Sequence, residues 1–300
     1  KISSSYYLFP TYYFNEMKKL PIITLILLIT ASCATDKDYI VTIKTEYGDM
    51  KAILYDETPE HKENFIKLAQ DGFYDSLLFH RVMKDFMIQG GDPNSKNTAP
   101  GTPLGNGGPG YNVPAEFNQD FFHIKGALSA ARQPDRVNPQ KESSGSQFFV
   151  VQGQTWTEDE LTTDQNKLNQ AVQQCMQRGD QDSVRQLLMN IYQNEGPQAY
   201  GKKINKMKDY FASVMQVNLD KAVAPERLQA YTTIGGAPHL DDEYTVFGKV
   251  IEGLEVIDKI AEQPTDRRDR PNENIMMSME VEELPKKKIT KLYGYEYPLD

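Results

Sequence analysis

The stretch LLFHRVMKDFMIQGGD, residues 77–92, decides the expected fold because it places polar groups inside an apolar strand pattern. Alternate residues of a strand face opposite sides, so one face can carry apolar surface with a few polar groups aimed at one spot. That composition is typical of a small apolar pocket with convergent hydrogen-bond donors, here Arg81 and Gln89. A guanidinium is almost never buried alone, so Arg81 either makes a structural ion pair or serves such a pocket.

Length and charge set the bounds on function. The chain has 300 residues, enough for one or two domains with a substantial core. It carries 33 Lys and Arg against 42 Asp and Glu, a net charge of -9. No continuous basic stripe is present, so nucleic-acid binding is not expected. Two cysteines, Cys33 and Cys175, cannot form a disulfide framework. The histidines show no close metal-ligand spacing, so we predict no metal site.

Residues 1–32 are expected to be an N-terminal extension and a signal peptide. From Met17 the chain has two lysines, an apolar run over 22–29 and small residues before Cys33. This order is typical of a secretory signal, and the run is shorter than the about 20 apolar residues that span a bilayer. The last residues resemble the lipobox of bacterial lipoproteins, although Thr30 stands where an aliphatic residue is usual.

The lipobox resemblance implies that Cys33 becomes the lipid-bearing first residue, followed by a polar linker over 33–38. The protein would then lie in the cell envelope, anchored to a bacterial membrane, either periplasm-facing or in the outer membrane. Plain secretion with an incidental cysteine is the alternative.

The following segments are predicted to be mainly short strands. Residues 39–55 alternate apolar and polar side chains around a turn, which is typical of a hairpin. A helix is expected to begin at Pro59 and to end near Gly72. Later apolar segments predict strands over 146–151, 244–250 and 275–284, with a helix over 253–261. Many short strands and few helices favour a closed β-barrel over a parallel sheet.

Residues 154–230 interrupt the strand pattern. Thr157 followed by Glu160 forms a capping box, and apolar residues then recur at helical spacing until Gly196 and Pro197 break the run. We predict an inserted helical subdomain of two or three helices, with Cys175 in its core. This insertion is also where a protein partner is expected to bind.

Five motifs occur in the order found in the cyclophilin family of peptidyl-prolyl cis/trans isomerases, which the chain resembles over 39–153 and 231–284. They are FHRV (79–82), FMIQGGD (86–92), LSAAR (128–132), SGSQFF (144–149) and TVFGKV (245–250). The resemblance implies a mainly β fold, an eight-stranded antiparallel barrel capped by two helices, with the insertion in a surface loop, where added length is tolerated. Residues 285–300 would form a C-terminal tail.

The resemblance also implies roles for individual residues. Arg81, Phe86 and Gln89 would be catalytic, with Arg81 donating to the imide nitrogen as the prolyl bond twists. The substrate-binding residues would be His80, Met87, Ala131, Arg132, Gln147, Phe149, His239, Leu240 and Tyr244. No cofactor is implied. The expected partners are proline-containing segments of unfolded or folding exported proteins.

Three positions depart from the family pattern. His239 stands where many members have Trp, Tyr244 where His is common, and Arg132 where some have Asn. The alternative function is therefore a non-catalytic peptide-binding or scaffolding module. The sequence GNGGPG at 105–110 matches G-x-G-x-x-G, but we expect a structural loop because a proline lies inside it and no strand–helix context surrounds it.

Overall fold

The computed structural model describes residues 36–99, 101–179 and 181–298. The expected signal and Cys33 lie outside these residues. The chain divides into a large unit, Tyr39–Glu283, and a terminal unit formed by the residues before and after it. In the terminal unit, α8 (Lys286–Tyr293) occupies part of the expected tail, and the Lys286 ammonium lies 3.3 Å from the Asp36 carboxylate. No helix in the described residues is both long and apolar enough to cross a membrane.

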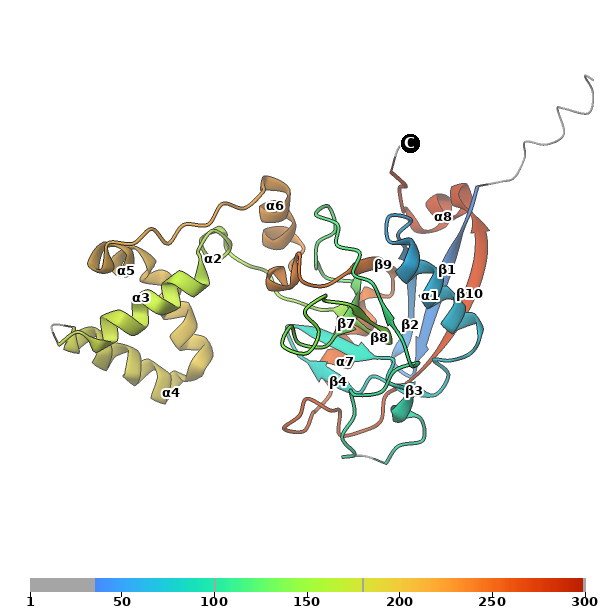
Figure 1. Ribbon diagram of the computed structural model, residues 1–300, viewed down its shortest axis with the longest axis horizontal. Helices are drawn as coiled ribbons and strands as arrows, with labels where there is room; N and C mark the ends of the chain where they lie inside the picture. The colour runs from blue at the N-terminus through green and yellow to red at the C-terminus, as the bar shows by residue number, and fades with distance from the viewer. Residues whose placement is uncertain (1–35, 100, 180, 299–300) are drawn as a thin grey trace, which may run out of the picture. The chain divides into compact units, whose positions relative to one another are not determined.

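The large unit is built on a mainly antiparallel sheet that curls on itself (Figure 1). Its hydrogen-bonded order is β3-β10-β1-β2-β9-β7-β8-β5-β4, with β6 paired to β8. The ends of this path, β3 and β4, are separated in sequence by only Phe79 and His80. The strands of the described chain are β1 (Lys37–Thr45), β2 (Gly48–Leu54), β3 (Leu77–Leu78), β4 (Arg81–Met83), β5 (Met87–Gly90), β6 (Asn112–Val113), β7 (Ala127–Arg132), β8 (Ser143–Val151), β9 (Val246–Glu252) and β10 (Met276–Pro285).

The predicted antiparallel barrel is confirmed, although the described residues contain ten strands where eight were expected. Part of the difference lies in β3 and β6, which contain two residues each and pair with β10 and β8. The first strand begins at Lys37, inside the segment expected to be a linker. The Lys286 backbone N–H donates to the Asp36 carbonyl at 2.8 Å, which fixes the chain just before this strand.

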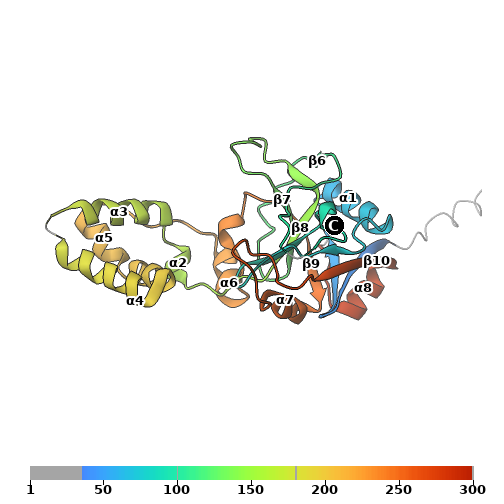
Figure 2. The ribbon, with the colours of Figure 1, turned by 90° about the horizontal axis from the view of Figure 1, so that it is seen from below.

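Two helices cover the sheet, α1 (Pro59–Gln70) and α7 (Leu254–Ala261) (Figure 2). Phe65 of α1 and Ile257 of α7 belong to the same buried cluster as Phe148 of β8. Pro59 stands in the first turn of α1 as predicted, where its missing N–H costs no helical hydrogen bond. Gly253 precedes α7 with a φ of 88°, and a Cβ there would lie 2.1 Å from the Asp49 carbonyl oxygen, so this entry to the helix requires glycine.

The insertion contains five helices in the described residues, where two or three were predicted. The capping box of Thr157 and Glu160 is confirmed at the start of the first helix. The predicted break at Gly196 is a kink inside the third of these helices, where Gly196 has a φ of 87°. The helices are α2 (Glu158–Leu161), α3 (Gln165–Gln177), α4 (Asp182–Lys206), α5 (Lys208–Met215) and α6 (Pro225–Thr233).

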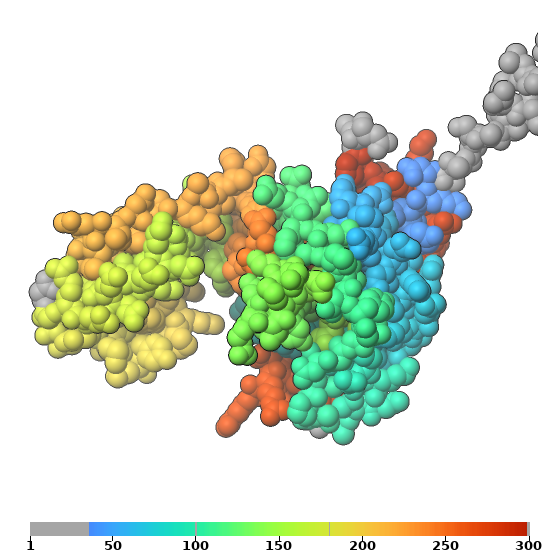
Figure 3. Space-filling model, viewed as in Figure 1, coloured from blue at the N-terminus to red at the C-terminus, as the bar shows by residue number. Residues whose placement is uncertain are grey.

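Helices α3, α4 and α5 pack on one another around a core of their own (Figure 2). Figure 3 shows them in yellow-green to gold, in contact with each other. Cys175 is fully buried in this core beside Leu168, Leu188 and Phe211, as predicted for a space-filling residue. Helix α6 is not a member of this cluster, and it crosses residue 230, the expected end of the insertion.

Candidate active site

The site begins with a row of side chains across three neighbouring strands. Arg81 of β4 lies opposite Gln89 of β5, and Gln89 lies opposite Phe149 of β8. Directly paired residues of an antiparallel sheet point to the same face, so these three side chains emerge together. Period-two alternation sends Phe148 to the main core and Phe149 to a second apolar cluster on the other face. The sheet thus places a guanidinium, a carboxamide and a ring side by side.

A cavity of about 150 Å³ opens at this row. Its lining is apolar at the base, where Met87, Phe149 and Leu240 are 1%, 5% and 7% exposed. The Tyr244 ring meets Phe149 edge-on, with 5.9 Å between ring centroids. Nine of the residues expected at the site line this cavity, which we call the prolyl cavity after the ligand that the family resemblance implies for it: Arg81, Phe86, Met87, Gln89, Ala131, Arg132, Phe149, Leu240 and Tyr244.

Arg81 is fixed at the mouth of the prolyl cavity. Its Nη1 donates to Gln89 Oε1 at 3.2 Å, and its Nη2 lies 3.0 Å from Met83 Sδ. The Arg81 side chain is 41% exposed, and its Nε lies 3.8 Å from a carboxylate oxygen of Asp269. A pair at that distance and exposure is weak, so the guanidinium is oriented by Gln89 and still accessible to a ligand.

Arg132 has a different role, although it lines the same cavity. Its side chain is only 6% exposed, and its guanidinium donates to the Glu243 carbonyl at 2.8 Å and to Glu243 Oε2 at 3.0 Å. The guanidinium also lies over the Tyr244 ring, 4.6 Å from the centroid. A hydrogen bond from Arg132 lowers the pKa of Asp135. Arg132 therefore holds the wall that carries Tyr244, and its donors are already engaged.

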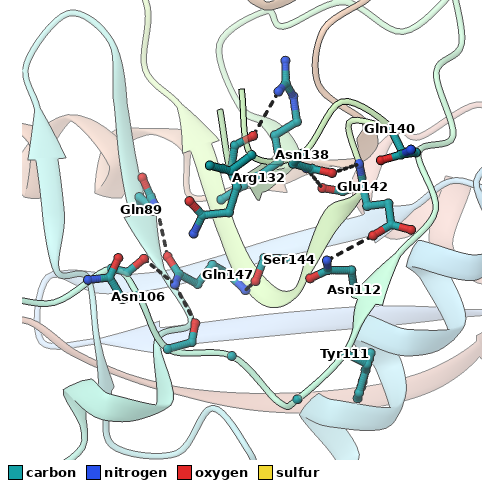
Figure 4. Close-up of a pocket in the computed structure, with 17 residues that line it drawn as sticks. Gln89, Asn106, Tyr111, Asn112, Arg132, Asn138, Gln140, Glu142, Ser144 and Gln147 are labelled. Carbon is teal, nitrogen blue, oxygen red and sulfur yellow. Dashed lines mark hydrogen bonds between the residues drawn. The ribbon is translucent and has the colours of Figure 1, made fainter. Parts of the chain in front are cut away.

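A second cavity, of about 590 Å³, adjoins the first and shares Gln89, Ala131 and Arg132 with it (Figure 4). Gln147 lies at its centre and accepts a hydrogen bond from Gln89 Nε2 at 3.1 Å. Gln147 Nε2 in turn donates to the carbonyls of Gly105 and Gly107, at 3.0 and 2.7 Å. The sequence had indicated Gln147 but not this cavity, because the irregular loop that forms its wall carries no periodic signal.

The glycine-rich segment 105–110 is a loop that forms one wall of this second cavity. Asp92, fully buried, accepts from the Gly105 N–H at 2.5 Å and holds the loop in place. A Cβ on Gly107 would lie 2.0 Å from Asp92 Oδ1, so glycine is needed for this close approach. No helix follows the loop, in agreement with a structural loop and not a nucleotide-binding turn.

Besides Gln147, two of the expected substrate contacts lie outside the prolyl cavity, His239 and His80. His239 is exposed, and its ring stands 5.2 Å from that of Phe86, so it extends the rim. His80 is only 5% exposed and lines a separate cavity of about 210 Å³ next to Gly105 and Arg270. Burial lowers the pKa of His80 to about 4, which keeps the ring neutral at pH 7. Arg81 and Gln89 line the same 210 Å³ cavity as His80, and the substrate contact of His80 stays a prediction.

Within residues 36–99, 101–179 and 181–298, His, Cys, Asp and Glu side chains form no group of three or more that could hold a metal ion. The residues present at the site offer one oriented guanidinium, hydrogen-bonding carboxamides and an apolar cavity.

Comparison with known proteins shows which family the chain resembles in sequence. A model of the "Cyclophilin type peptidyl-prolyl cis-trans isomerase/CLD" family matches residues 40–166 and 164–281. A Staphylococcus haemolyticus protein named "Putative peptidyl-prolyl cis-trans isomerase" is 31% identical over 253 residues, which cover 83% of this chain and 93% of that protein.

A longer relative and a solved structure were also found. A Streptococcus pyogenes protein named "Putative bifunctional phosphatase/peptidyl-prolyl cis-trans isomerase" is 31% identical over 244 residues, which cover 79% of this chain but 37% of that protein. A crystal structure of a Cryptosporidium parvum cyclophilin type peptidyl-prolyl cis-trans isomerase aligns at 20% identity with a TM-score of 0.47, covering 82% of this chain and 98% of that one. On the family match and the 31% identity over nearly the whole staphylococcal relative, the chain belongs to the cyclophilin family of peptidyl-prolyl cis-trans isomerases.

Proposed function

We propose that this chain accelerates cis–trans isomerisation of X–Pro bonds without a covalent intermediate, and that Arg81 stabilises the twisted imide. Rotation about an amide bond has a barrier of about 18–20 kcal/mol because resonance gives the bond double-bond character. When an X–Pro bond twists, resonance is lost and the nitrogen regains a lone pair. A donor placed at that nitrogen gains a hydrogen bond only in the twisted state, which is selective binding of the transition state.

The observation that carries this proposal is the fixed position of Arg81 beside an apolar cavity. Met87, Phe149 and Leu240 offer a binding place for the proline ring. The hydrogen bond to Gln89 holds the guanidinium in orientation before the substrate arrives. Such preorganisation avoids rearrangement at the moment of reaction. The proposed substrates are proline-containing segments of unfolded or folding proteins, and the second cavity beside Gln147 lies where a flanking residue of the peptide would pass.

The test is a proline-tetrapeptide isomerisation assay on wild type, Arg81→Ala and Arg81→Lys. Removing one preorganised donor is expected to lower kcat/KM on the order of 10²- to 10³-fold. Arg81→Lys keeps the charge but loses the planar fork, so an intermediate rate is expected. Arg267→Ala is the matched control, because Arg267 is an exposed arginine of the same region that lines neither cavity.

Equal rates for wild type and Arg81→Ala would overturn the mechanism. A wild-type chain that binds the peptide but gives only the uncatalysed rate would support the alternative function, a non-catalytic peptide-binding module.

The proposed place of action is the cell envelope, with the chain tethered through a lipid on Cys33. The support is the order of lysines, apolar run and small residues before Cys33 in the sequence. Mass spectrometry of the N-terminus after expression in a bacterial host should find cleavage before Cys33 and an added diacylglycerol mass. A Cys33→Ser variant should lack that mass. An unmodified cysteine in the wild type would exclude the anchor.

We further propose that the insertion makes an additional contact with a protein partner, namely unfolded clients. Leu187, Met189 and Tyr192 of α4 are 42%, 47% and 52% exposed, and Met189 and Tyr192, three positions apart, lie on the same face of the helix. The triple replacement by Lys should slow catalysed refolding of a proline-limited protein while leaving the tetrapeptide rate unchanged. Equal refolding rates would remove this part of the proposal.

A further inference from the structure

We propose that α6, the last helix of the insertion, positions the wall of the prolyl cavity through Asp241. Tyr231 and Arg227 of α6 bind this aspartate, which directly follows the cavity residue Leu240. The inference rests on the proposed function, because it concerns the same cavity. It assigns a role in substrate binding to two residues that none of the five family motifs contains.

Asp241 is a buried carboxylate, and one of its oxygens, Oδ1, accepts most of its hydrogen bonds. Its side chain is 4% exposed, and Oδ1 accepts from the Tyr231 hydroxyl at 2.7 Å and from the His123 N–H at 3.0 Å. His123 Nδ1 lies 3.0 Å from the same oxygen and is the donor, because the carboxylate can only accept. Burial lowers the pKa of His123, so the ring stays neutral. A buried carboxylate is costly unless such bonds are made, so the position of Asp241 depends on them.

Arg227 supplies the opposite charge from the same helix. Its guanidinium lies 3.7 Å from Asp241 Oδ2 and donates to both carboxylate oxygens of Asp242, at 2.9 and 3.2 Å. It also lies over the Phe122 ring, 5.2 Å from the centroid. A bidentate guanidinium–carboxylate pair fixes the orientation of both side chains as well as pairing their charges. Asp242 has a φ of 63°, in the left-handed region that aspartate adopts more readily than most non-glycine residues.

These contacts reach the cavity by two routes. In the first, the turn after Asp241 is closed by a hydrogen bond from the Tyr244 N–H to the Leu240 carbonyl at 3.2 Å, and both residues line the cavity. In the second, the His123 ring stacks on Phe149, with 6.1 Å between centroids and 14° between planes. The Asp241 carboxylate is therefore linked to three side chains that line the cavity, Leu240 and Tyr244 through the turn and Phe149 through His123.

Helix α6 is itself fastened to the sheet side of the large unit. Tyr231 is 1% exposed. The Trp156 backbone N–H donates to the Tyr231 carbonyl at 3.2 Å, and the Trp156 indole N–H donates to the Gly236 carbonyl at 2.9 Å. A Cβ on Gly236 would lie 2.2 Å from the His123 carbonyl oxygen, so the chain after α6 passes directly against the residue that binds Asp241.

The experiment uses Tyr231→Phe and Arg227→Met in the full chain, each removing the polar contact while keeping much of the side-chain volume. Two quantities are measured, KM in the tetrapeptide assay and, independently of turnover, the Kd of a proline peptide by calorimetry. Both should rise on the order of fivefold while kcat stays within about twofold, as expected when a bond supporting binding is lost. Arg227→Lys should recover part of the affinity because it keeps the charge.

Tyr210→Phe and Arg185→Met are the matched controls, because neither residue lines the prolyl cavity. The Tyr210 hydroxyl of α5 donates to Gln181, and Arg185 of α4 pairs with an aspartate, Asp182. Neither control should change KM or Kd. The emission of Trp156, the chain's single tryptophan, shows whether α6 stays in place, and it should be unchanged in Tyr231→Phe.

Unchanged KM and Kd in both α6 variants would overturn the inference. So would a lower kcat at constant KM and Kd, because loss of folded protein reduces the amount of active enzyme without changing its affinity. If wild type binds the peptide but does not isomerise it, the proposed function fails, and the Kd comparison still decides this inference.

Discussion

Arg81 and Gln89 face each other across the β4–β5 pair, and the guanidinium donates to the carboxamide oxygen at 3.2 Å. The other end of the same carboxamide donates to Gln147, which holds the loop around Gly105. Gln89 therefore connects the residue proposed to act on the imide with the wall of the neighbouring cavity. A side chain with both a donor and an acceptor is needed at this point.

The first prediction concerns Gln89→Leu, which removes both bonds with little change in volume. Arg81 loses the partner that orients it, so kcat/KM should fall about tenfold, the effect of one hydrogen bond to a charged group. Gln70→Leu is the control, because Gln70 of α1 is an exposed glutamine that lines neither cavity. A wild-type rate in Gln89→Leu, together with an inactive Arg81→Ala, would show that Arg81 needs no such partner.

The second prediction concerns the free space in the prolyl cavity. Ala131 is half-buried and lines the cavity of about 150 Å³, so Ala131→Leu would place a larger side chain where the proline ring is expected to bind. Moving the leucine side chain aside when the substrate binds should cost about 1–3 kcal/mol of binding free energy. KM should therefore rise about tenfold or more. Ala131→Ser serves as the nearly isosteric control. If KM is the same in both variants, and thermal stability is also equal, the proline ring does not bind in this cavity.

The third prediction concerns the outer part of the insertion. Thr163 and Asp220 form an antiparallel bridge, and the Lys221 N–H donates to the Thr162 carbonyl at 2.7 Å. Replacing residues 164–219 by Asn-Gly would join these two paired segments in a two-residue turn. Since α3, α4 and α5 have their own core, the shortened chain should keep its melting transition and a tetrapeptide kcat/KM within about twofold of wild type.

Deleting 154–230, the limits expected from the sequence, should behave differently. That deletion also removes Trp156 and Arg227, so we expect a higher KM even if the sheet still folds. Unfolding or aggregation of the shorter deletion, 164–219, would show that α3–α5 contribute to the stability of the sheet.

The fourth prediction concerns pH and His80. Burial lowers the folded-state pKa of His80 to about 4, below the ordinary value of 6.5, so the unfolded chain binds the proton more tightly. Stability from this residue is fully present above about pH 6.5 and is lost as the pH falls towards about 4. The loss should amount to about 3 kcal/mol, from 1.36 kcal/mol per pKa unit.

Urea unfolding near pH 7 and near pH 4.5 measures this effect. His80→Gln should reduce the pH dependence of the unfolding free energy by about 2–3 kcal/mol relative to wild type. Burial also lowers the pKa values of His61 and His123, so the variant should retain part of the slope. An identical pH dependence of the unfolding free energy in wild type and variant would mean that folding does not change the pKa of His80.

Much of the fold could be predicted because the signals are local. The alternation around Phe148 and Phe149 separates core from cavity, Pro59 sets the start of α1, and Thr157 with Glu160 sets the start of α2. The extra strands β3 and β6 were missed because two residues are too few to show a period. Residue 230, the predicted end of the insertion, lies inside α6, so a helix continues across that limit.

The sequence by itself determined which residues alternate, where helices such as α1 and α2 begin, and that Arg81 and Gln89 could serve one pocket, because these depend on neighbours within a few positions. The pairing of Arg81 with Gln89 across β4 and β5 came from the structure. Only the tertiary structure decided that the His80 side chain is buried, that the Arg132 guanidinium donates hydrogen bonds to Glu243, and that Tyr231 binds Asp241. The physical reason is that these contacts join segments whose packing depends on the closure of the whole sheet. Periodicity shows the face on which a side chain lies, but it does not show which other segment covers that face.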